Sequence, residues 1–238
     1  MGKVVTFKAL PYEQVASGVS KAAVTGADAR QMSAEVIRLA PGARFADAVP
    51  QGSDRYFFTL KGAATLSADN GSHEMTEDTF AAVQEATSFT LVNEAHEEVE
   101  IISVLAPPPG NGAAAAAGFK GGVAVIPMDK APVLEVPDQK KTRLYFASKE
   151  AAKTERSHAM IVKYQPETVT NLHMHPNADS MFVFLTGKVR FNVNGEDQVV
   201  ERGQATYFPA GDKHSLKVAS GDVSFLEFHI PGSYVTVK

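Results

Sequence analysis

His173-Met174-His175 and Gly203-Gln204-Ala205-Thr206-Tyr207-Phe208-Pro209-Ala210-Gly211-Asp212-Lys213-His214 are the two stretches that decide the fold of this chain. Residues two apart in an extended strand point to the same side, so His173 and His175 aim both imidazoles into one space. Turn-forming Gly and Pro flank the apolar run before His214, which indicates that another strand delivers a third imidazole. Imidazole nitrogens about 2.0 to 2.2 Å away suit zinc, iron, copper, nickel or manganese. The sequence therefore predicts a metal site at His173, His175 and His214; three structural histidines are the alternative.

The two stretches resemble the two motifs of the cupin superfamily. The first motif reads Gly, five residues, His-x-His, three or four residues, Glu, six residues, Gly; the second reads Gly, five residues, Pro-x-Gly, two residues, His, three residues, Asn. Here Glu167 stands at the first Gly, Ser180 at the Glu and Val218 at the Asn, while the remaining motif positions match. The resemblance implies small antiparallel jelly-roll barrels with a metal near the mouth. The change at Ser180 removes the family's carboxylate ligand and leaves three histidines.

The second half of the chain repeats the first at a shift of 125 residues. Met181 to Gly187 falls on Tyr56 to Gly62, and Ile161 to Pro166 falls on Val36 to Pro41, without a gap. Between the halves, a run of Pro, Gly and Ala is typical of a linker. We therefore expect an all-β chain of two tandem jelly-roll (cupin) barrels, a bicupin. The expected division is a degenerate barrel at 1–106, a linker at 107–122 and a metal-binding barrel at 123–238.

Aromatic and β-branched residues between frequent turn signals predict short strands in the first half. No long periodic helix is expected before residue 30. The predicted strands are 33–39, 55–60, 63–68, 79–83, 88–92 and 99–105.

The repeat also predicts that the first barrel has lost its metal. The positions of the three histidines fall on Ala48, Pro50 and Phe89, none of which can serve as a ligand in place. That barrel is expected to act as a packing partner, lid or dimerisation surface. Arg55 falls on Ser180, and a guanidinium inside a barrel mouth needs Asp47, Asp54 or a bound anion as its partner. We favour a structural ion pair.

Three other residues are candidates for catalysis. Tyr207 lies near the turn that precedes His214 and offers a hydroxyl to position a substrate. Glu227 and His229 share one face of the last strand, and an inward orientation would let them orient a ligand or act as acid and base. Alternation along the strand leaves open which face is inside. Asp179 adjoins the vacant Glu position, but alternation should turn it away from the metal.

Composition bounds the class of protein. The 238 residues are 44% hydrophobic, which supports an ordinary packed core, and the net charge of -4 gives no electrostatic reason to expect a nucleic acid partner. Cysteine is absent, so a metal must be held by His and oxygen ligands. We expect neither a secretory signal nor a membrane span, and hence a cytoplasmic protein. By analogy with similar proteins, a homodimer is expected.

Three neutral imidazoles leave a metal its full charge, which favours a small anionic or chelating oxygen substrate. Some cupin oxygenases resemble this chain in holding iron by three histidines without Glu, so an Fe(II) dioxygenase is the leading hypothesis. One alternative is a non-redox isomerase, lyase or hydrolase with Zn, Mn or Ni. Another is a non-catalytic ligand-binding or storage-like bicupin.

Overall fold

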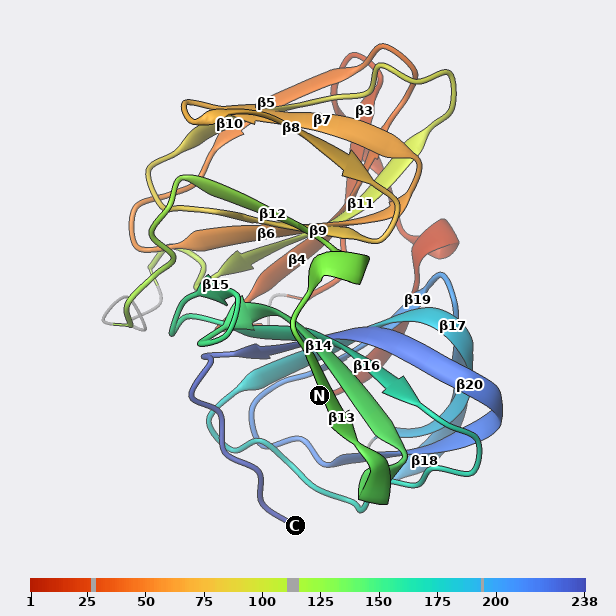
Figure 1. Ribbon diagram of the computed structural model, residues 1–238. Helices are drawn as coiled ribbons and strands as arrows, with labels where there is room; N and C mark the ends of the chain where they lie inside the picture. Colours follow the sequence, from red (N-terminus) through yellow and green to blue (C-terminus); the bar gives the residue numbers. More distant parts are fainter. Residues whose placement is uncertain (27–28, 111–115, 194) are drawn as a thin grey trace.

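Strands dominate both halves of the chain in the computed structural model, which describes residues 1–26, 29–110, 116–193 and 195–238 (Figure 1). The strands (β) and 3-10 helices (η) of the first half are β1 (Lys3–Thr6), η1 (Phe7–Ala9), β2 (Glu13–Ala16), β3 (Val19–Ala23), β4 (Ser33–Leu39), β5 (Arg44–Ala48), β6 (Asp54–Lys61), β7 (Ala63–Ala68), β8 (Gly71–Thr76), β9 (Thr79–Val83), β10 (Ser88–Val92) and β11 (Val99–Ala106). Those of the second half are β12 (Val123–Pro127), η3 (Met128–Lys130), β13 (Val133–Val136), η4 (Pro137–Gln139), β14 (Lys141–Ser148), β15 (Ala152–Lys153), β16 (His158–Tyr164), β17 (Asp179–Val193), β18 (Glu196–Glu201), β19 (Gln204–Phe208) and β20 (His214–Ile230).

The strands form two jelly-roll barrels, as predicted. In the first, a sheet in the order β12-β9-β6-β11-β4-β3-β2 faces a second sheet in the order β5-β10-β7-β8. In the other, the order is β1-β19-β17-β20-β16-β14-β13, with β18 paired to β17 and β15 to β14. The first barrel is the upper one in Figure 1 and the metal-binding half is the lower one. The 125-residue repeat is visible in β4 and β16, which occupy equivalent positions at this shift.

The two barrels exchange strands. Strand β1, from the start of the chain, pairs antiparallel with β19 of the second barrel, while β12 pairs antiparallel with β9 of the first. Accordingly, the label N in Figure 1 lies at the lower barrel and β12 lies in the upper one. The predicted division at 106 and 123 therefore leaves one strand of each barrel in the other half. Residues 111–115 of the predicted linker lie outside the described residues.

Burial on both faces explains the nearly continuous apolar runs of β6 and β17. On β17, Phe182 and Phe184 pack inside the second barrel, whereas Met181 packs between the barrels. The interface core also contains Phe80 and Phe146, whose rings stack with centroids 4.9 Å apart. The inward faces of β16, β17 and β20 thus form the wall of one barrel interior.

A buried ion network joins the barrels. Asp54, which is fully buried, accepts hydrogen bonds from the guanidinium of Arg156 at 3.0 Å and from the hydroxyl of Thr154 at 2.8 Å. The other guanidinium nitrogen of Arg156 contacts Glu85 at 3.0 Å. Asp54 and Glu85 belong to the first repeat and Arg156 to the second, so this network crosses the interface.

Inside the first barrel, Arg55 forms the structural ion pairs that we favoured. Its guanidinium lies 3.2 Å from Glu35 and 3.5 Å from Asp47, and donates a hydrogen bond to Ser103 at 3.0 Å. Asp54 is not its partner, because that carboxylate is bound by Arg156.

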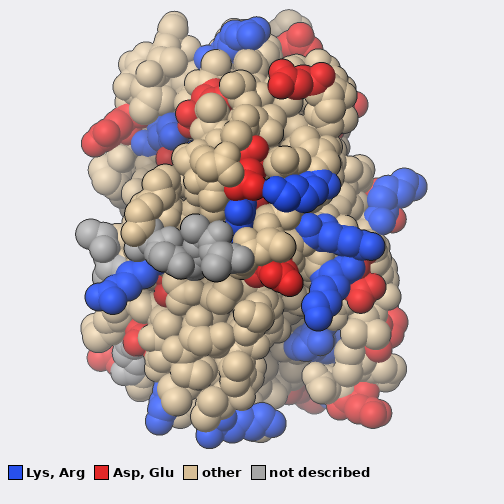
Figure 2. All heavy atoms as spheres, turned by 90° about the vertical axis from the view of Figure 1, so that its left-hand side faces the viewer, with Lys and Arg blue, Asp and Glu red and all other residues tan. Residues whose placement is uncertain are grey.

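Acidic and basic side chains lie side by side on the face shown in Figure 2, in keeping with the small net charge. Within the described ranges, no helix has the length and apolar character needed to cross a membrane.

Candidate metal centre

Three histidines converge inside the second barrel. The ligand atoms of His173, His175 and His214 all lie within 4.8 Å of one another. His214 begins β20, whereas His173 and His175 lie in an irregular extended segment. Two backbone hydrogen bonds fix this segment beside the strand, from His173 N to His214 O at 3.0 Å and from His214 N to His173 O at 2.8 Å. The predicted convergence is confirmed, although the first pair does not lie on a regular strand.

Backbone carbonyls orient all three rings. The Nδ1 atom of His173 lies 2.7 Å from the Asn171 carbonyl, that of His175 lies 3.0 Å from the Val235 carbonyl, and that of His214 lies 3.2 Å from the Asp212 carbonyl. A carbonyl can only accept, so each Nδ1 must carry the proton and each Nε2 is left with a free lone pair. Such contacts fix the tautomer of metal-ligating histidines.

Burial keeps two of these imidazoles neutral. Desolvation, together with the other nearby histidines, lowers the pKa of His214 to about 3 and that of His175 to about 4. Neutral rings are what a metal ion requires of its ligands.

One atom of the cluster lacks a partner that a metal would provide. The Nε2 atom of His214 is buried and accepts no hydrogen bond within the described part of the chain. A buried nitrogen lone pair without a partner is costly. The orphaned atom, the shared tautomer and the neutral donor set fit a divalent metal ion, so the cluster suggests a metal site.

A hydrogen-bonded chain replaces the missing carboxylate ligand. Ser180, at the family's Glu position, lies 2.9 Å from His229 Nδ1, and His229 Nε2 lies 2.5 Å from Glu227. Burial acts to raise the pKa of Glu227, but His229 and Lys141 lower it to about 2, so the group is a carboxylate. The His229 ring also lies 4.4 Å from that of His175. Glu227 and His229 therefore point inward, beside the metal site.

A cavity of about 650 Å³ opens in front of the histidines. Its apolar wall includes Phe182, Phe191 and Phe225, and its polar lining includes Glu227 and His229. Its polar lining also includes residues that the sequence analysis did not single out, among them Lys141, Arg143, Tyr164 and Tyr234. Residues 141–143 are all polar, so no alternation of polar and apolar residues could have predicted that Lys141 and Arg143 point inside the barrel.

Tyr207 lies elsewhere. It is fully buried in the core between the barrels, and its hydroxyl donates a hydrogen bond to Asp179 at 3.0 Å. Alternation along β19 sends Tyr207 outward, whereas Phe208 packs inside the barrel. The structure thus brings Glu227 and His229 to the metal site but not Tyr207. As expected, Asp179 is turned away from the metal and also accepts from Ala210 N at 3.0 Å.

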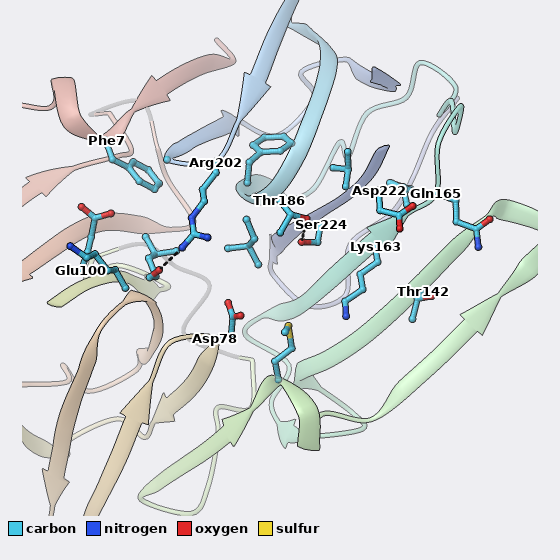
Figure 3. A pocket seen from close by; sticks show the side chains of 18 residues that line it. Phe7, Asp78, Glu100, Thr142, Lys163, Gln165, Thr186, Arg202, Asp222 and Ser224 are labelled. Atoms are coloured by element: carbon cyan, nitrogen blue, oxygen red, sulfur yellow. Dashed lines mark hydrogen bonds between the residues drawn. The ribbon is translucent and has the colours of Figure 1, made fainter. Parts of the chain in front are cut away.

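A second cavity, of about 530 Å³, lies between the barrels (Figure 3). It is lined from both repeats, by Asp78 and Glu100 on one side and Lys163 and Asp222 on the other. Arg202 reaches across to the Leu60 carbonyl at 3.3 Å. Its described lining contains no histidine, so it is separate from the metal site.

Comparison with known proteins identifies a cupin domain in the second half of the chain. Residues 160–229 match the model of the cupin domain. A search of curated proteins finds no match. Among solved structures, a putative glyoxylate-induced protein from Pseudomonas aeruginosa is 14% identical, with a TM-score of 0.77 over 100% of this chain and 91% of its own. Protein Ylba from E. coli is 13% identical, with a TM-score of 0.78 over 98% of this chain and 92% of its own. Lactobacillus farciminis oxalate decarboxylase is 14% identical, with a TM-score of 0.74 over 99% and 88%.

Two tandem jelly-roll barrels, with a convergent imidazole set in the second, define a two-barrel cupin architecture. Residues 160–229 match the cupin domain over the strands that surround the histidines, and the solved structures share the fold of the whole chain.

Proposed function

We propose that the protein is a metal-dependent enzyme that acts on a small organic molecule in its second barrel, as a three-His Fe(II) dioxygenase. The observation that carries this proposal is the set of three carbonyl-oriented imidazoles without a carboxylate ligand. A set of neutral ligands leaves the ion its full charge and leaves positions open for a substrate. Bound Fe(II) would supply the redox chemistry that reaction with dioxygen requires.

The chain's own residues have separate roles in this proposal. His173, His175 and His214 hold the ion through Nε2. Phe182 and its aromatic neighbours exclude water from the cavity. Glu227 accepts a hydrogen bond from His229 Nε2 and so holds a proton there, while Nδ1 accepts from the hydroxyl of Ser180. The Glu227 and His229 pair can then exchange a proton with a bound substrate.

Metal content and oxygen uptake together test the proposal. Protein purified without chelators should contain one metal ion per chain, and the Fe(II) form should consume oxygen with a diketone or a phenolic acid. The His214→Ala variant should lose stoichiometric metal. Full iron occupancy with no oxygen uptake on any of these compounds would contradict the dioxygenase, and metal retained by His214→Ala would contradict the site.

A non-redox isomerase, lyase or hydrolase with Zn, Mn or Ni is the second candidate. The Glu227 and His229 pair supports it, because an acid and base beside a Lewis-acidic ion suffices for proton transfer or hydrolysis. A redox-inert metal at full occupancy, with substrate turnover in the absence of oxygen, would favour this candidate.

We also propose a cytoplasmic homodimer without a nucleic acid partner. Strand β13, at one end of the second barrel's main sheet, supports self-association because Val133 and Leu134 are 59% and 45% exposed. Sedimentation velocity should give the mass of two chains, and Leu134→Lys should shift it toward one.

A further inference from the structure

We propose that Arg143 and Lys141 bind a carboxylate group of the substrate, so that the cavity selects a small carboxylate with an apolar body. This inference rests on the proposed function of the metal cavity and names the class of molecule that enters it.

Strand register places both cations inside the barrel. On β14, Lys141 and Arg143 are two residues apart and share one face. They stand opposite Tyr164 and Val162 of β16, whose side chains pack in the barrel interior. Both cations line the same cavity as the three histidines. A guest that touches the metal site is therefore within the same enclosure as the guanidinium.

Arg143 lacks a full set of partners. Its Nε is buried and has no hydrogen-bond partner. The guanidinium interacts with Tyr145 and, electrostatically, with Glu227, but it lies in no ion pair among the described residues. Glu227 is the one inward carboxylate of the described lining, and it is hydrogen-bonded to His229 at 2.5 Å. The other lining carboxylates, Asp138 and Glu167, are exposed. Two inward cations thus face one carboxylate that is already engaged.

The first barrel shows what a purely structural cation looks like at this position. Lys21 stands opposite Ile37 as Arg143 stands opposite Val162. Ile37 and Val162 are equivalent at the 125-residue shift, so strand pairing makes Lys21 and Arg143 equivalent in space. The Lys21 ammonium lies 2.7 Å from Glu35, which also binds a second inward cation, Arg55. In the second barrel the residue equivalent to Glu35 is Met160. That position therefore carries no counterion, and the carboxylate opposite Met160 on the neighbouring strand, Glu227, is hydrogen-bonded to His229.

The chemistry of the cavity then defines its guest. A guanidinium presents a planar fork of donors that matches a carboxylate in two parallel hydrogen bonds. Lys141 adds a second positive charge on the same strand face. The phenylalanine wall accommodates an apolar or aromatic body. Together these groups favour an amphipathic carboxylate, with another end free to reach the three histidines.

Benzoate and its uncharged analogue benzamide test this subsite by calorimetry on the metal-loaded protein. Benzoate should bind saturably, at least ten times more tightly than benzamide. Arg143→Met with Lys141→Met should weaken benzoate at least tenfold and leave benzamide unchanged. Lys21→Met is the matched control, because it removes the equivalent cation of the first barrel, and benzoate affinity should not change. Thermal unfolding of each variant checks that it is folded.

The metal-free His214→Ala variant separates this inference from the proposed enzyme. If the His214→Ala variant still binds benzoate, and if this binding still depends on Arg143, the carboxylate subsite is supported independently of the metal. Benzoate that binds no better than benzamide, fails to saturate at millimolar concentration, or is insensitive to the double substitution would overturn it. So would benzoate binding that needs His214 but not Arg143, because the carboxylate would then be on the metal.

Discussion

Individual side chains of the metal site couple protonation to folding. The pKa of His214 is lowered to about 3 and that of His175 to about 4 in the folded protein, from an ordinary value of 6.5. Below about pH 6.5 these two imidazoles bind protons in the unfolded chain but remain unprotonated in the folded chain. The free energy of unfolding of the metal-free protein should therefore fall as the pH drops from 6.5 toward 4. The slope is at most about 1.4 kcal/mol per pH unit for each histidine, measured by denaturant titration with a chelator present.

His214→Phe provides the control for that slope. The ring of His214 already stacks on Phe208 with centroids 4.5 Å apart, so a phenyl ring suits the surroundings. The variant should lose about half of the combined slope of these two histidines. An unchanged pH dependence would mean that His214 does not titrate with unfolding.

One residue at the edge of the site carries backbone strain. Glu167 has φ of 67°, a left-handed conformation that costs a non-glycine residue about 1 kcal/mol or more. It stands where the cupin motif has Gly. Glu167→Gly should raise the free energy of unfolding by about 1 kcal/mol, as measured by denaturant titration. Glu196→Gly, in exposed strand β18, should lower it instead; a loss of stability at both positions would contradict the strain.

Among individual residues, the sequence predicted the cluster of three histidines but only part of its surroundings. His173, His175 and His214 were predictable because motif spacing is local. Tyr207 was misplaced because one position along a strand decides which way a side chain points. Arg143 was missed because its missing counterion shows only when the two barrels are compared in space.

Among the elements, the segment after β20 supports the metal site. Its Val235 carbonyl orients His175, and Val235 N donates to Asn177 at 2.8 Å. Tyr234 stacks on His229 with ring centroids 3.9 Å apart. Removal of residues 233–238 should lower metal affinity about 10- to 100-fold, because the Val235 carbonyl that orients the His175 ring is lost. Competition with a chromophoric chelator measures this.

A shorter truncation is the matched control for the tail. Removal of Lys238 alone keeps the Val235 carbonyl and the two backbone hydrogen bonds between Val237 and Met174, and should leave metal affinity within about threefold of the full chain. An equal loss in both truncations would show that the Val235 contact is not the cause.

Strands were predictable where a run of aromatic and β-branched residues was bounded by turn-forming residues. The six predicted strands between residues 33 and 105 occur within one residue of their predicted ends, because aromatic and β-branched runs between turns leave little choice. Strands β5 and β8, in the same range, were not predicted. β1, β2 and β3 were not predicted, since they are short and every residue of β2 is exposed. The pairing of β1 with β19 joins residues about 200 positions apart, and no local pattern encodes such a partner.

Across the whole molecule, the buried ion network between the barrels should contribute more to the free energy of unfolding than an exposed ion pair does. Arg156→Met would leave Asp54, which is fully buried, without its counter-charge, at a cost of about 3 to 5 kcal/mol. Arg202→Met removes the ion pair between Arg202 and Glu77, which also joins the two repeats. The side chains of Arg202 and Glu77 are 62% and 47% exposed. That change should cost less than about 1 kcal/mol. Similar losses in chemical denaturation would contradict the ranking.

Because β1 pairs with the second barrel and β12 with the first, neither barrel is complete without the other. A fragment that begins at 123 would carry β12 with nothing to pair with and would leave the β19 edge bare, one strand away from β17 and Ser180. The barrel without the three histidines cannot be removed without exposing the flank of the barrel that contains them. Natural selection on the histidine cluster would therefore also preserve the shape of its neighbour.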